Sequence, residues 1–275
     1  RERSYFSIGS LEANFSELVD IEIDSNNGRA LVLDAAKKQI FAINLETQIP
    51  TLFAGLDYGQ SNNFLERPVA MSFNEDGTKI MVVDAELGEV IAVDLETREQ
   101  TIFSSLGGKD QGQTFSQLEN INLADNTLFA LGESLFEVDL QTGAREVVSD
   151  RQRTELGPRW SEFPADLAVD VKHGFAYILD HNQDAIYSVN LLDGTRSIIS
   201  SRTKPNSDNE CISPFGIALD SDNSQLYVSD ASLRALLTVD IATGQRTIVS
   251  DDSIGLGPSF NFAITDIAYD KENKV

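Results

Sequence analysis

A unit of about 50 residues recurs along the chain, and this repeat constrains the fold more than any other feature of the sequence. Each copy contains four short segments rich in Val, Ile, Phe and Tyr, separated by turn residues such as Asn27-Gly28 and Asp193-Gly194. Four strands in a repeat of this length predict the blades of an all-β propeller. The anchor positions of the five copies step by 48 to 50 residues: Asp34, Asp84, Gly132, Asp180 and Asp230.

The repeat also predicts the blade boundaries within a single propeller domain covering residues 1–275. At the ends of the chain, residues 3–7 match the fourth strand of a blade and residues 262–270 match a first strand. We therefore expect a sixth, incomplete blade shared between the two ends, in a natural chain that continues after Val275; a seven-bladed parent is the alternative. The five complete blades are predicted at 18–53, 68–104, 118–149, 164–200 and 214–250.

Two of the copies carry motifs of a known superfamily. The segments 214–220 (PFGIALD) and 226–230 (LYVSD) resemble the NHL, YWTD and gluconolactonase-like propellers, and 176–180 (AYILD) is similar to the YWTD variant. The resemblance covers nearly the whole chain and implies a β-propeller fold. It does not select an activity, because this architecture supports hydrolases, lyases and binding modules.

The charge of the chain excludes some partners. Its formal net charge is −23, so we expect neither nucleic acid nor an anionic membrane surface as a partner. No apolar run approaches the ~20 residues of a transmembrane helix. The single cysteine, Cys211, allows no internal disulfide, and the chain begins with Arg1 instead of methionine. We expect a processed or trimmed bacterial protein that is exported to the periplasm or the medium.

Aspartate recurs at the ends of the first three strands of the blades, as in Asp24, Asp34 and Asp94, and asparagine replaces it at Asn44 and Asn74. Both side chains accept hydrogen bonds from backbone N–H groups in tight turns. We interpret these residues as turn caps, since no catalytic mechanism needs one acid in every blade.

If the strands of a blade are lettered a to d, the long d–a loops and the b–c loops lie on the same side of the propeller. Long loops on a rigid scaffold are where binding residues usually lie. This side is also less acidic than the remainder of the chain. The first hypothesis is a non-enzymatic binding or scaffold propeller that recognises a protein or a glycan here; the alternative for the aromatic residues is packing onto the blades. The predicted binding residues are Tyr58, Phe64, Arg67, Phe115, Arg159, Trp160, Arg202 and Arg234.

The second hypothesis is a divalent-metal-dependent hydrolase of the lactonase or esterase kind, or a lyase. Acidic and amide side chains at the start of strand a could meet at the mouth of a central channel and bind Ca²⁺ or another divalent cation. His181 is a candidate general acid or base, with Glu119 and Asp166 as further catalytic candidates. The alternative is that the acids bond to backbone N–H groups of the neighbouring blade. The candidate metal ligands are Asp20, Glu119, Asn120, Asp166 and Asp266.

The gluconolactonase-like resemblance implies a calcium ligand immediately after the proline that opens strand a. At that position only Glu119 could ligate strongly, because the other blades carry Val19, Val69, Ala165, Phe215 and Thr265. This departure argues against a lactonase site of that kind.

Overall fold

The structure is a computed structural model. It describes residues 15–55, 65–74, 77–105, 118–124, 127–139, 144–206, 208–209, 212–255 and 266–269.

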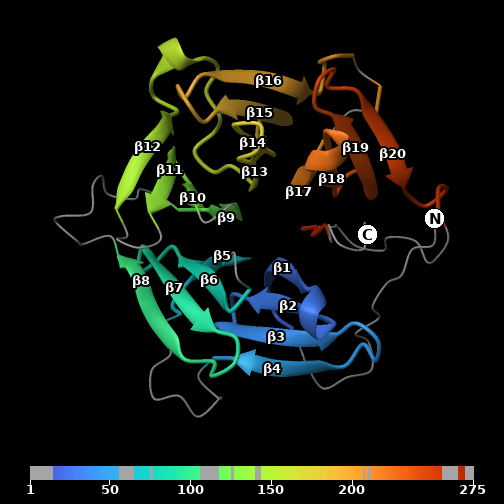
Figure 1. The fold of residues 1–275 in the computed structure, drawn as a ribbon. Helices are drawn as coiled ribbons and strands as arrows, with labels where there is room; N and C mark the ends of the chain where they lie inside the picture. The colour runs from blue at the N-terminus through green and yellow to red at the C-terminus, as the bar shows by residue number, and fades with distance from the viewer. Residues whose placement is uncertain are drawn as a thin grey trace. The chain divides into compact units, whose positions relative to one another are not determined.

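The described residues form an all-β propeller of four-stranded antiparallel blades (Figure 1). Each blade is one sheet whose strands are paired in chain order. The strands are β1 (Leu18–Asp24), β2 (Arg29–Asp34), β3 (Gln39–Asn44) and β4 (Pro50–Ala54) in blade one; β5 (Pro68–Phe73), β6 (Lys79–Asp84), β7 (Glu89–Asp94) and β8 (Gln100–Ser105) in blade two; and β9 (Asn120–Ala124), β10 (Thr127–Leu131), β11 (Ser134–Asp139) and β12 (Arg145–Asp150) in blade three. Blade four contains β13 (Asp166–Asp170), β14 (Phe175–Asp180), β15 (Ala185–Asn190) and β16 (Arg196–Ser201), and blade five contains β17 (Pro214–Asp220), β18 (Gln225–Asp230), β19 (Ala235–Asp240) and β20 (Arg246–Ser250).

The expected number of six blades is wrong for the part of the chain that the structure describes, which contains five. Residues 266–269 lie beside β17, where a Cβ on Gly216 would be 2.8 Å from the Asp266 Cα. They join no β-ladder, however, so the expected first strand of a sixth blade is absent from this segment. The matching residues 3–7 lie outside the described part.

The chain divides into two compact units, each with its own core. One comprises Phe6–Ala130 and Glu137–Glu146, and the other Arg1–Tyr5, Leu131–Phe136 and Val147–Val275. In the first unit, blades one and two bury apolar side chains such as Leu31 and Ile80 against each other. In the second unit, Tyr177 and Leu226 belong to the core between blades four and five. These cores remove the apolar face of each sheet from water, which drives the packing of blade on blade.

Neighbouring blades are also joined by a hydrogen bond that recurs at the same place. The Asp20 carboxylate accepts from the N–H of Ile21 and, at 2.5 Å, from the N–H of Met71 in the next blade. Asp166 does the same with Leu167 and, at 2.7 Å, with Ile217. The residues joined between blades are 51 positions apart in both pairs, so the sequence repeat and the contact between blades have the same period.

The turn-capping role of the repeated aspartates is confirmed where the structure describes the turns. Asp84 is fully buried; it accepts from the N–H groups of Glu66 and Arg67 before β5 and from that of Leu87 in the b–c turn. One carboxylate thus fixes the d–a loop to the b–c turn. Equivalent bonds are made by Asp34, Asp180 and Asp230.

Candidate functional site

The d–a loop that follows β12 is organised around an arginine of the next blade. Arg196, at the start of β16, is 6% exposed, and its guanidinium lies inside the loop. The Nη1 atom donates to Ser149 Oγ at 2.8 Å, and the Nε atom donates to the Pro158 carbonyl at 2.9 Å. Its other donors bond to the carbonyl oxygens of Asp150, Arg153 and Gly157. A rigid, forked cation therefore satisfies carbonyls at the end of β12 and in the following loop, which contains a short 3-10 helix (Thr154–Leu156).

Arg246 repeats this arrangement one blade later. It starts β20, is 5% exposed, and donates to Ser200 Oγ at 3.1 Å and to the Lys204 carbonyl at 2.8 Å. Its other acceptors are the carbonyls of Ser201, Asn206 and Asp208. Arg145 occupies the same position in blade three and is equally buried, although the loop before it lies outside the described residues. Burial lowers the pKa of Arg145 and Arg196.

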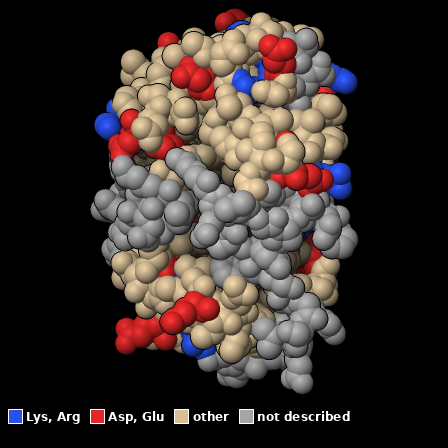
Figure 2. Space-filling view, turned by 90° about the vertical axis from the view of Figure 1, so that its right-hand side faces the viewer, with Lys and Arg blue, Asp and Glu red and all other residues tan. Residues whose placement is uncertain are grey.

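The loops held in this way expose apolar side chains. Phe163 is 47% exposed, Ile212 38% and Ile254 42%, and each lies on a different d–a loop of the second unit. Exposed arginines lie on the same d–a loops or on a neighbouring b–c loop: Arg159, Arg202 and Arg234. We call these six residues the loop surface. Figure 2 shows acidic side chains in several patches on one side of the molecule, with basic side chains next to some of them.

The arginines of the loop surface each have a polar partner at an exposed position. Arg202 Nη1 lies 3.9 Å from Asp184 Oδ2, and Arg234 Nη2 lies 3.1 Å from Asp252 Oδ2, with both arginine side chains more than half exposed. Arg159 Nη2 donates to the Gln152 amide at 2.7 Å. Exposed ion pairs of this kind contribute little to stability.

Trp160, a predicted binding residue, is not exposed on the loop face. Its side chain is fully buried, its Nε1 donates to the Gly132 carbonyl at 3.1 Å, and the Arg196 guanidinium lies 5.1 Å from its ring centre. An indole in a long loop is more stable inside the small core of that loop than in water, which was the alternative from the sequence. Arg67 is exposed, as are the three arginines of the loop surface. Tyr58, Phe64 and Phe115 lie outside the described residues.

Three of the candidate metal ligands, Asp20, Asp166 and Asp266, bond to backbone N–H groups. Both carboxylate oxygens of Asp20 and of Asp166 accept backbone N–H groups, and Asp266 accepts from Ile267 at 2.8 Å. Burial raises the pKa of Glu119, while Arg67 opposes that shift. Asp20, Glu119 and Asn120 belong to one unit, and Asp166 and Asp266 to the other. No group of three metal-ligating side chains occurs within the described ranges, and metal binding stays a prediction.

His181, the candidate acid or base, lies in the b–c loop of blade four. Its ring stacks on Phe215 with the ring centres 5.2 Å apart, and the Nδ1 atom is buried without a hydrogen-bond partner among the described residues. Burial raises the pKa of the nearby Asp184, an effect that Arg202 opposes. The His181 ring is therefore held in place, and its role as an acid or base stays a prediction.

Sequence reasoning missed the two loop arginines, Arg196 and Arg246. A signal was present, because a turn glycine followed two positions later by arginine recurs in blades three, four and five. An arginine next to a turn is usually exposed, whereas the side chains of Arg196 and Arg246 enter the loop that follows the preceding blade.

Comparison of the fold supports the propeller resemblance. The chain is similar to a structure described as a nidogen/laminin complex (13% identity, TM-score 0.66, covering 91% of this chain and 84% of that one). It is also similar to an auxiliary nutrient binding protein from Bacteroides thetaiotaomicron (13% identity, TM-score 0.64, covering 94% and 65%). A third similar structure is the extracellular domain of a hybrid two-component system of the same organism (14% identity, TM-score 0.57, covering 87% and 28%).

These identities establish the fold alone, and the chain spans less than two thirds of both Bacteroides chains. No family model matches the sequence, and no curated protein matches it. Among the described residues, no helix is long and apolar enough to cross a membrane.

Proposed function

We propose that this chain is a binding propeller of an exported protein and that it recognises a protein partner through the loop surface. The observation that carries the proposal is that apolar side chains are exposed on loops whose backbone is bonded to buried side chains. Phe163 lies three residues after the buried Trp160 in the loop that Arg196 holds. Ile212 is anchored by its N–H to the buried Asp230.

Pre-organised loops favour binding because little conformational entropy is lost when the partner docks. Aromatic residues and arginine are enriched in protein interfaces, and the aliphatic Ile212 and Ile254 suit a protein better than a glycan. An extracellular domain and a nutrient binding protein among the similar folds are consistent with export.

Site-specific crosslinking tests the proposal. A photoreactive phenylalanine analogue at position 163 should crosslink one partner from the native source, and competition with unlabelled protein should remove the product. The variant Phe163→Ser/Ile212→Ser should compete at least about tenfold less well, since each lost apolar contact costs about 1 kcal/mol or more.

A matched control is available in Ile49→Ser/Ile102→Ser. These two residues are 47% and 48% exposed but lie outside the loop surface. The control should compete like the wild type. Equal loss in both double variants would refute the loop surface as the binding site.

A further inference from the structure

A pocket of about 510 Å³ lies against one face of blade five, apart from the loop surface. This volume lies within the usual range of small-molecule sites. The pocket is lined by Asp220, Asn223, Gln225, Tyr227, Thr238, Val249 and Tyr269.

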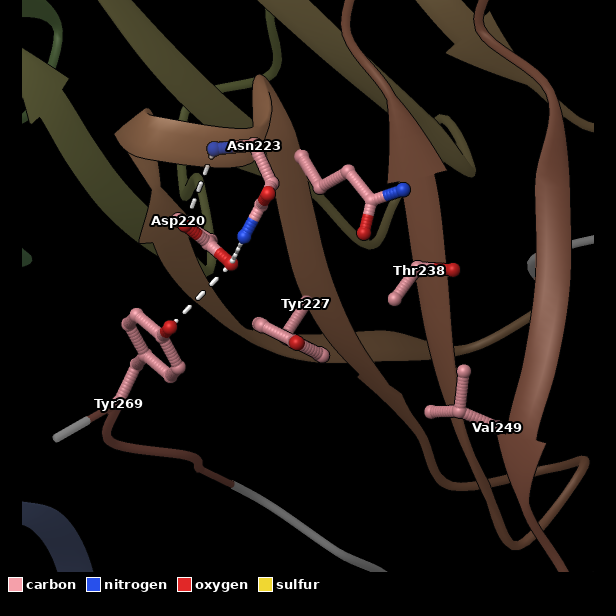
Figure 3. Close-up of a pocket in the computed structure, with 7 residues that line it drawn as sticks. Asp220, Asn223, Tyr227, Thr238, Val249 and Tyr269 are labelled. Carbon is pink, nitrogen blue, oxygen red and sulfur yellow. Dashed lines mark hydrogen bonds between the residues drawn. The ribbon is translucent and has the colours of Figure 1, made fainter. Parts of the chain in front are cut away.

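The register of blade five explains why these side chains meet. Asp220 pairs with Gln225 across β17 and β18, and Tyr227 pairs with Thr238 across β18 and β19, so all four share one face of the sheet. Tyr269 comes from the later segment 266–269 and packs beside Tyr227, with the two ring centres 5.3 Å apart. Figure 3 shows the two rings on one side of the pocket and Thr238 on the adjoining strand.

A short chain of hydrogen bonds fixes one wall. Asp220 Oδ2 accepts from Asn223 Nδ2 at 2.7 Å and from the Tyr269 hydroxyl at 3.2 Å. Burial and the adjacent Asp220 carboxylate raise the pKa of Tyr269, which keeps this hydroxyl a donor. In contrast, the Gln225 amide and the Tyr227 hydroxyl make no hydrogen bond to the residues that the structure describes.

The equivalent face of blade four packs against blade five. Phe175 and Tyr177 occupy the positions of Gln225 and Tyr227, and both pack against the core that blade four shares with blade five. In blade five the phenylalanine is replaced by an amide, and Tyr227 is only partly buried. This substitution removes apolar packing surface and supplies hydrogen-bonding groups, which suits a polar ligand.

The lining selects among ligand classes. The lining contains one carboxylate, which is too few ligands for a calcium ion. An anion is disfavoured by Asp220 and by the net charge of −23. Two aromatic rings beside amide, hydroxyl and carboxylate groups match a ring that has an apolar C–H face and hydroxyl groups at its edge.

We propose that this pocket binds a neutral pyranose sugar, with the ring stacked on Tyr227 or Tyr269 and its hydroxyls bonded to the Gln225 amide. This inference does not rest on the loop surface. A monosaccharide that makes these contacts has an expected Kd of about 1 mM.

The test uses methyl glycosides of glucose, galactose and mannose, observed by saturation-transfer difference NMR on the whole chain. At least one should bind, and glucuronate should bind more weakly than glucose. Gln225→Ala and Tyr227→Ala should each weaken binding about tenfold, the effect of losing one hydrogen bond or one stacked ring. Tyr227→Phe, which keeps the ring, should retain part of the affinity.

Gln245→Ala is the control, because Gln245 is an exposed glutamine of the same blade outside the pocket. It should bind the sugar like the wild type. Absence of binding by all three neutral glycosides at roughly 20 mM would overturn the proposal. So would tighter binding of glucuronate than of glucose, or affinity unchanged in both alanine variants.

Discussion

Arg196 is buried and donates to four backbone carbonyls, of which those of Asp150 and Arg153 also accept a backbone N–H. Replacing it with methionine keeps the apolar stem but removes a charged donor from all four acceptors. We expect Arg196→Met to lower the free energy of unfolding by at least about 3 kcal/mol. Arg202→Met, at a guanidinium that is 56% exposed, should change it by less than about 0.5 kcal/mol. Chemical denaturation of both variants measures the difference, and equal losses would contradict the role assigned to Arg196.

Asp166 allows the metal hypothesis to be tested at one residue. Its carboxylate bonds to the N–H groups of Leu167 and Ile217. Asp166→Ala should therefore cost about 1–3 kcal/mol, and the loss should be the same in EDTA and in excess Ca²⁺. Thermal unfolding under both conditions measures it. If Ca²⁺ stabilises the wild type but not the variant, the carboxylate binds metal and the hydrolase alternative gains support.

At the scale of single elements, two turns of blade four contain glycines in different environments: the a–b turn contains Gly174 and the c–d turn contains Gly194. Gly194, at φ 72°, would place a Cβ in contact with the Val148 carbonyl of the preceding blade, whereas Gly174, at φ 75°, has open space around it. Alanine should cost about 1 kcal/mol at Gly174, from backbone strain alone. It should cost about 3 kcal/mol at Gly194, where the adjoining strand must also move. Urea midpoints of the two variants test this; equal costs would show that the blades are not in close contact at this turn.

Strands β14 and β15 carry two buried tyrosines, Tyr177 and Tyr187. Burial, assisted by a nearby aspartate in each case, raises the pKa of both to about 12 from the ordinary value of 10.0. A raised pKa in the folded state gives stability that is present below pH 10 and lost as the pH rises from 10 to 12. Tyr187→Phe should therefore show a smaller loss over that window, measured by denaturation at successive pH values. An unchanged slope would contradict the prediction.

The molecule as a whole carries a net charge of −23, and part of its acidity lies in the turn-capping aspartates. Like charges repel in the compact state, and salt screens them. Raising NaCl from about 20 mM to about 0.5 M should increase Tm by a few degrees. Sucrose at equal osmolality serves as the uncharged control. A Tm that falls with NaCl would show that attractive pairs such as Arg29–Asp24 outweigh the repulsion.

The sequence repeat was enough to predict four-stranded blades, and the exchange of aspartate with asparagine was enough to predict the turn caps. Both signals are local, because strand periodicity and Asx turns depend on neighbouring residues. The burial of Trp160 and the loop contacts of Arg196 depend on residues in an adjacent blade, so they could not be read from local patterns. The expected sixth blade failed because residues 266–269 match a strand in sequence but form no ladder.

The contacts of Arg196 and Arg246 limit which segments of this chain can be transferred to another protein. The loop at 150–158 is shaped by Arg196, which lies beyond the whole of the next three strands. A graft that copied only the loop, or exchanged blades at their boundaries, would separate the segment from the side chain that gives it its form. The smallest transferable module runs from Ser149 to Arg196, and the following one, from Ser200 to Arg246, begins after the first has ended. Each module therefore contains the end of one blade and most of the next.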